Sequence, residues 1–129
     1  MSKAEARQLV EYMRKIQRRM GLNEWRISLE IYEQTELPSR LWLEGEAGIG
    51  YMSSWHEQRS ATLHVVAYPR DLTIRQIIRH EVAHLLLEPM WRVVKRVEKP
   101  LGSTAWEIIS EAYREAEEIA VNRIMRAMS

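Results

Sequence analysis

The chain has 129 residues, of which 46% are hydrophobic and 29% charged, and it contains no cysteine. This length allows one domain with a hydrophobic core, so we expect a single domain over residues 1–129. The net charge of +1 gives no global bias toward nucleic acid, and without cysteine the chain forms neither disulfides nor thiolate zinc sites.

Residues 2–20 predict an amphipathic helix. The apolar residues recur at helical spacing, basic residues fill the other face, and Gly21 follows as a C-cap; the apolar positions are Leu9, Val10, Met13, Ile16 and Met20. The segment lacks the apolar core of a signal peptide. No stretch of the chain approaches the roughly 18 apolar residues of a membrane span. We therefore expect a cytoplasmic protein that does not contact a membrane.

The next part of the chain predicts a small three-stranded sheet. Residues 25–32 alternate, with Trp25, Ile27, Leu29 and Ile31 on one side. Residues 33–47 contain a proline, a glycine and many charges, so we expect a loop there. Residues 48–58 and 60–67 predict two further strands, which a tight turn near Arg59 joins.

Two helices complete the predicted order. Thr73, with Gln76 three residues later, forms a capping box that opens a helix, and Pro89 favours an interruption of that helix. Residues 100–103 break the chain. A second capping box at Thr104 and Glu107 predicts a last helix that runs to about Met128. The order of helix, three strands, helix and helix indicates an α+β fold.

The most informative motif is His80-Glu81-Val82-Ala83-His84, an H-E-x-x-H pattern. Positions four apart on a helix of about 3.6 residues per turn share one face, so both imidazoles can bind one Zn²⁺ ion. Between them, Glu81 can take a proton from a zinc-bound water and pass it to a leaving amine, as in a metallopeptidase. The alternative is that His80 and His84 are surface histidines on a helix flank.

A third zinc ligand downstream of His84 has to be a carboxylate, because no histidine follows His84. The positions of the glycine and third histidine of a metzincin hold Leu87 and Met90. Glu88 and Glu98 are poor candidates, since they lie on or just after the same helix. The remaining candidates are Glu107, Glu111, Glu115, Glu117 and Glu118.

The two helical motifs together resemble the gluzincin metallopeptidases. In that family the third ligand is a glutamate on a following helix, and an acidic or amide residue one turn later holds a zinc-binding histidine. Residues 118–122, Glu-Ile-Ala-Val-Asn, match this pattern, with Val121 in place of a common alanine. The resemblance therefore implies His80, His84 and Glu118 as ligands, Glu81 as base and Asn122 as support for a histidine. The element order is also similar to small H-E-x-x-H proteins of phages and mobile elements.

One observation favours Glu117 over Glu118 as the third ligand. On a helical wheel Glu117 lies at the margin of an apolar arc, whereas Glu118 shares a stripe with charged residues. The arc consists of Trp106, Ile109, Ala112, Tyr113, Ala116, Ala120 and Ile124. Glu117 and Glu118 both remain candidates for the third ligand. Glu118 is preferred because Asn122 lies one turn after it, at the position from which the family supports a zinc-binding histidine.

The sequence thus predicts a zincin-like peptidase that uses Zn²⁺ to hydrolyse a peptide or protein substrate, with no nucleic-acid partner. A first alternative is a regulatory peptidase that cleaves one partner, such as a repressor. A second alternative is a non-catalytic zinc-binding domain that interacts with proteins. The remaining histidines, His56 and His64, are expected to be packed or surface residues. The five tryptophans are expected to pack in the core and at hinges, with the alternative that Trp91 and Trp106 line a pocket.

Overall fold

A computed structural model describes residues 1–33, 50–67 and 73–128 of the chain. The predicted loop over residues 33–47 therefore lies almost entirely outside the described residues. The described residues form two compact units, Met1–Val82 and Ala83–Ser129, and the helix that carries the H-E-x-x-H motif passes from the first to the second. The expectation of one domain over residues 1–129 stays a prediction.

The architecture is α+β, as predicted. The described residues form four helices and three strands. In chain order they are α1 (Lys3–Arg19), β1 (Arg26–Tyr32), β2 (Gly50–Trp55), β3 (Ser60–Val66), α3 (Ile74–Lys95), α4 (Glu98–Leu101) and α5 (Ser103–Ala127). Within these residues no helix is both long and apolar enough to cross a membrane.

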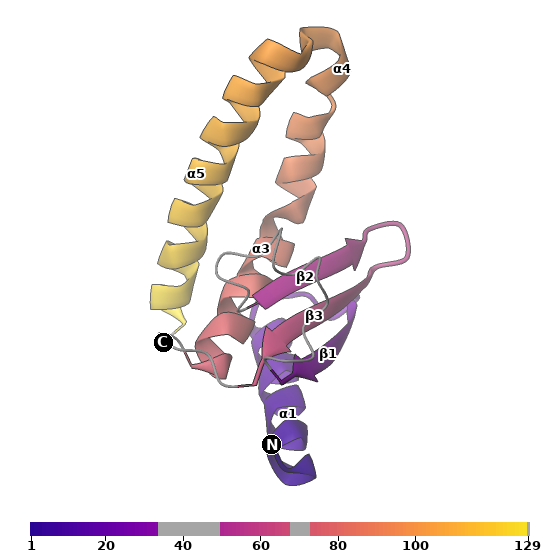
Figure 1. Cartoon of the computed structure of the whole chain (residues 1–129), viewed down its shortest axis with the longest axis vertical. Helices are drawn as coiled ribbons and strands as arrows, with labels where there is room; N and C mark the ends of the chain where they lie inside the picture. Colours follow the sequence, from indigo (N-terminus) through magenta and orange to yellow (C-terminus); the bar gives the residue numbers. More distant parts are fainter. Residues whose placement is uncertain (34–49, 68–72, 129) are drawn as a thin grey trace. The chain divides into compact units, whose positions relative to one another are not determined.

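The sheet is mixed, with the strand order β1-β3-β2 (Figure 1). β1 pairs with β3 in parallel, while β2 pairs with β3 antiparallel as a hairpin, with Met52 opposite Leu63. The turn of this hairpin ends at Arg59, which has a positive φ of 49° and whose amide donates to His56 O. The alternation predicted for β1 is confirmed, because Arg26, Ser28 and Glu30 are exposed and the residues between them are half-buried.

The core of the first unit is built from apolar faces that the sequence pattern predicts. In β3, the alternate residues Ala61, Leu63 and Val65 are all buried. Helix α1 buries Leu9, Met13 and Ile16, and the first turns of α3 bury Ile77, Ile78 and Val82. Because residues three to four apart share one face of a helix, each helix presents a single apolar stripe to the core.

The second unit is a helical hairpin that consists of the end of α3, the short α4, and α5 (Figure 1). Aromatic rings hold the two long helices together, with centroids 5.7 Å apart for Trp91 and Trp106 and 5.3 Å apart for Trp91 and Tyr113. Both tryptophans are half-buried, so they pack between the two helices and not in the buried core that the sequence predicted for them. Their packing fixes the position of α5 along α3.

Two sequence-based boundaries were wrong. Helix α3 continues through Pro89, although proline removes one backbone hydrogen bond and costs about 3 kcal/mol or more in a helix interior. The predicted cap at Thr104 is not used, because α5 begins at Ser103 with Gly102 as N-cap, and Gly102 has the positive φ of 80° that glycine tolerates.

Candidate metal centre

The capping box at the start of α3 forms as predicted and sets the register of the motif helix. The amide of Thr73 donates to Gln76 Oε1 at 2.8 Å, and the amide of Gln76 donates to Thr73 Oγ1 at 3.1 Å. Seven residues after Thr73, His80 is half-buried, as are Glu81 and His84. The motif therefore lies on the flank of α3, beside the stripe that faces the core.

His84 has a carboxylate at each of its ring nitrogens. Within the helical hairpin, Glu118 Oε1 lies 2.8 Å from His84 Nε2, and Glu117 Oε2 lies 3.4 Å from His84 Nδ1. A neutral imidazole carries one N–H, so it can donate to only one of these carboxylates at a time. If a cation binds at one ring nitrogen of His84, the other nitrogen carries the proton. That N–H can then donate to the glutamate beside it.

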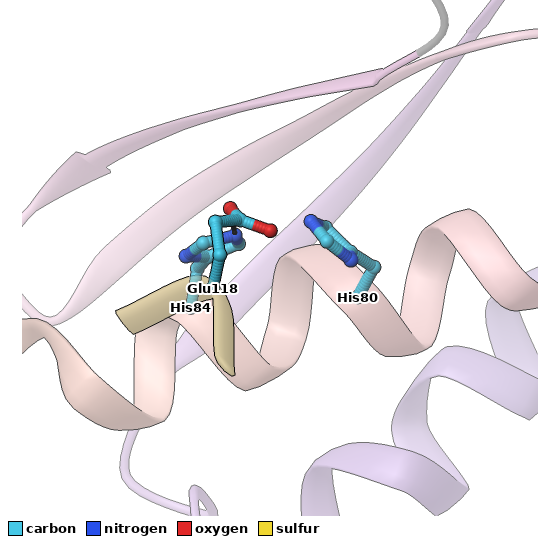
Figure 2. Close-up of side chains that lie close together, drawn as sticks. All are labelled: His80, His84 and Glu118. Carbon is cyan, nitrogen blue, oxygen red and sulfur yellow. Dashed lines mark ion pairs between the residues drawn. The ribbon is translucent and has the colours of Figure 1, made fainter. Parts of the chain in front are cut away.

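His80, His84 and Glu118 form a group that could hold a metal ion. One ligand atom from each residue lies within 4.8 Å of the others. Figure 2 shows both imidazoles on the same side of α3, with the carboxylate of Glu118 beside them. The three residues that the resemblance implied as ligands therefore lie close together. His80 and His84 are both on α3, and Glu118 of α5 contacts His84.

The donor set and its spacing fit a tetrahedral zinc ion. Donors bound at about 2.0–2.1 Å at tetrahedral angles are about 3.3 Å apart. The distance of 2.8 Å between His84 Nε2 and Glu118 Oε1 is shorter than this, as for a direct ion pair, and the 4.8 Å limit of the group is longer. The three donors thus lie near one another but not at the spacing of bound zinc, so binding the ion would require the side chains to move.

Glu117 is next to a half-buried tyrosine. The hydroxyl of Tyr113 lies 3.4 Å from Glu117 Oε1 and 3.4 Å from the carbonyl oxygen of Leu87. Burial, followed by the negative charge of Glu117, raises the pKa of Tyr113 to about 12. Tyr113 therefore keeps its proton and can donate it to Glu117. The side chain of Glu117 is only 17% exposed, against 43% for Glu118, so Glu117 is the more buried of the two.

Sequence reasoning missed the contact between Glu117 and His84. Asn122, which the resemblance implied as support for a histidine, is exposed, and Glu117 is the residue at the second nitrogen of His84. The signal was present in the sequence, because Glu117 lies at the margin of the apolar arc of its helix. That position suits a carboxylate that is partly buried beside a ligand.

Glu88 adds a further carboxylate to the hairpin, one turn after His84 on α3. Burial raises the pKa of Glu88, and its carboxylate lies 4.0 Å from the Nε of Arg92. The charge of Glu88 also contributes to the raised pKa of Tyr113. Glu88 is therefore part of the polar surroundings of Tyr113, while the metal-binding group consists of other residues.

The remaining histidines, His56 and His64, are not members of this group. His64 is buried in β3, where Tyr32 Oη lies 2.9 Å from its Nδ1 and Ser53 Oγ lies 3.4 Å from its Nε2. The ring of His56 makes an edge contact with Trp25, with centroids 5.9 Å apart. His64 is thus a packed residue of the sheet, and His56 is a half-buried residue of the β2–β3 turn.

Comparison of the chain with models of known families, with curated proteins and with solved structures finds no match. The case for a function therefore depends on the chemistry of the site itself.

Proposed function

We propose that the protein is a zinc-dependent peptidase of the gluzincin type, with a zincin-like fold. The observation that carries the proposal is the meeting of His80, His84 and Glu118 within 4.8 Å, with Glu81 next to His80 in the H-E-x-x-H motif. Two imidazoles and one carboxylate are the ligand set of several catalytic zinc sites, which leave a fourth position open. A bound zinc ion would supply Lewis-acid activation of water and of a substrate carbonyl.

Glu81 is the proposed general base. Its carboxylate would accept a proton from the attacking water and then deliver it to the amine that leaves. The helix holds Glu81 one residue after His80, on the half-buried flank of α3. A carboxylate there is close to the ligands but does not belong to the group that they form.

The edge of the sheet beside Glu81 suits an extended peptide. Among the described strands β2 is at an edge, because the order is β1-β3-β2. Its first residue, Gly50, lies directly against α3: a Cβ atom on Gly50 would be 2.5 Å from Ile77 Cγ2 and 3.7 Å from Glu81 Cγ. A peptide that added to β2 as a further strand would therefore run past the proposed base.

Zinc content tests the ligands. Purified wild-type protein is expected to hold one zinc ion per chain, and His80→Ala or His84→Ala is expected to abolish stoichiometric binding. A Glu57→Gln variant, altered at an exposed position in the β2–β3 turn, serves as the control and should keep its zinc. Undiminished zinc in both histidine variants would overturn the assignment of the ligands.

Hydrolysis tests the activity. The zinc-loaded protein should cleave members of a peptide library, with products identified by mass spectrometry. Glu81→Gln should keep the metal and lose hydrolysis by about 10²–10⁴-fold, because an amide does not accept the proton of water. Equal turnover by wild type and Glu81→Gln would exclude Glu81 as base. Zinc-loaded protein that cleaves no peptide would contradict a general peptidase and favour one of the two alternatives, a single protein target or a non-catalytic zinc domain.

A further inference from the structure

A second site lies in the first unit, in a hollow of about 450 Å³ between α1 and β1. Three arginines line it: Arg14 and Arg18 from consecutive turns of α1, and Arg26 from the start of β1. Asn23, Trp25 and Ser28 also line the hollow. Within the described chain, none of the residues that line this hollow is acidic.

Helix α1, which forms one wall of the hollow, is rich in basic residues. Helix α1 carries six basic residues and only two acidic ones, Glu5 and Glu11, while the whole chain has a net charge of only +1. Arg14 and Arg18 are four residues apart and so share one face of α1, where like charges repel each other. Both arginines line the same hollow as Arg26, so an anion bound among them would relieve this repulsion.

The segment between α1 and β1 forms a fixed wall. The buried side chain of Gln17 donates through Nε2 to the carbonyl oxygens of Leu22 and Trp25, the first at 2.8 Å. Gly21 permits the turn through its positive φ of 72°. These contacts hold the wall in one conformation, so a ligand would meet a site that is already formed.

The acidic residue of this segment is directed elsewhere. Glu24 Oε1 lies 3.4 Å from the Nη1 of Arg59, and both side chains are about half exposed. Arg59 also accepts, through its carbonyl oxygen, the amide of Arg26 at 2.9 Å. The carboxylate nearest in sequence to Asn23 and Trp25 is thus paired outside the hollow.

We propose that this hollow binds an organic phosphate of nucleotide size. Arginine forms paired hydrogen bonds with phosphate oxygens, and three arginines can neutralise a ligand that carries two or three negative charges. The amide of Asn23 and the hydroxyl of Ser28 can bond to a sugar or another neutral polar group. A volume of about 450 Å³ is within the range of small-molecule sites. The proposal does not depend on the metal centre.

Isothermal titration calorimetry of the full chain with ADP tests the site. Adenosine is the matched probe without phosphate, and inorganic pyrophosphate is the probe without a nucleoside. We expect ADP to bind, pyrophosphate to bind more weakly and adenosine to give no heat. The absence of ADP binding at about 1 mM, or equal binding of adenosine, would overturn the proposal.

Charge-removing variants locate the binding. Arg18→Gln and Arg26→Gln should each weaken ADP about tenfold or more, since each removes a charge-assisted hydrogen bond. Arg7→Gln removes a charge from the same helix outside the hollow and should leave affinity within about twofold. Equal loss in Arg7→Gln and Arg18→Gln would reduce the effect to general charge and refute the site.

His84→Ala, measured in the same way, should bind ADP as the wild type does, because the metal-binding group is made of other residues. A loss of ADP binding in His84→Ala would place the phosphate at the metal centre and overturn the proposal. Failure of ADP to bind to any variant would leave the zinc and hydrolysis experiments unaffected. The two proposals can therefore fail separately.

Discussion

Replacing Glu117 and Glu118 separately should separate the metal ligand from the residue that supports His84. Glu118 lies at His84 Nε2, at 2.8 Å, and belongs to the group with His80. Glu117 lies at His84 Nδ1, at 3.4 Å, and is itself held by Tyr113. The two variants remove the same charge from adjacent positions of α5, so a difference between them reports the position of each carboxylate.

The expected magnitudes follow from these two positions. Zinc bound by four protein ligands gains about 10–16 kcal/mol, or about 2.5–4 kcal/mol for each ligand, so Glu118→Ala should weaken zinc about 10²–10³-fold. Glu117→Ala leaves all three ligands but lets the ring of His84 rotate, and such losses are typically about 10–100-fold. Asn122→Ala should change affinity little, because Asn122 is exposed.

Competition with a chromophoric zinc chelator measures these affinities at constant pH and ionic strength. Glu115→Ala is the matched control, an exposed glutamate on the same helix whose loss changes the net charge equally. Circular dichroism and thermal unfolding establish that each variant folds. Glu117→Ala with a larger loss than Glu118→Ala would refute the reasoning and make Glu117 the ligand. Equal losses in all three glutamate variants would reduce the effect to general electrostatics.

Three further predictions concern the surroundings of the site and the first unit. Gly50→Ala should destabilise the fold by about 1–3 kcal/mol in urea denaturation, because its Cβ would be 2.5 Å from Ile77 Cγ2 in the buried core; unchanged stability would contradict the close packing of β2 on α3. Gln17→Ala should cost about 1–3 kcal/mol, since it removes the donor to two carbonyl oxygens in a buried place, whereas Gln8→Ala, at an exposed position of α1, should cost little. The pKa of Tyr113 is about 12 in the folded protein and about 10.0 when unfolded, so its contribution to the free energy of unfolding should be complete below pH 10.0 and decline as the pH rises toward 12. This loss of stability between pH 10.0 and 12 should be smaller in Tyr113→Phe, which has no hydroxyl to titrate. Identical dependence of stability on pH in the two proteins would refute the burial of the hydroxyl.

Features set by neighbouring residues could be predicted from the sequence. The reciprocal bonds of Thr73 and Gln76 involve a segment of four residues, and the spacing of His80 and His84 depends only on the helix between them. The alternation of β1 likewise depends on a period of two along one strand. The parallel pairing of β1 with β3 could not be predicted from the alternation of residues, because such a pairing depends on a connection of many residues between the two strands.

The rotation of α5 about its own axis could not be predicted from the sequence, because it depends on tertiary packing. The helical wheel directed Ile109, Ala112 and Ala116 inward, yet all three are exposed, and the residues that α5 buries are Ser110 and Val121. Three of the seven residues of the predicted arc are alanines, which gain little free energy from burial, since burial of a side chain is worth about 25 cal/mol per Å² of apolar surface. The large rings of Trp106 and Tyr113 therefore decide the rotation through their contacts with Trp91. This rotation turns Glu117 and Glu118 together toward His84, so the two candidates that the sequence opposed contact the same imidazole, each at a different nitrogen.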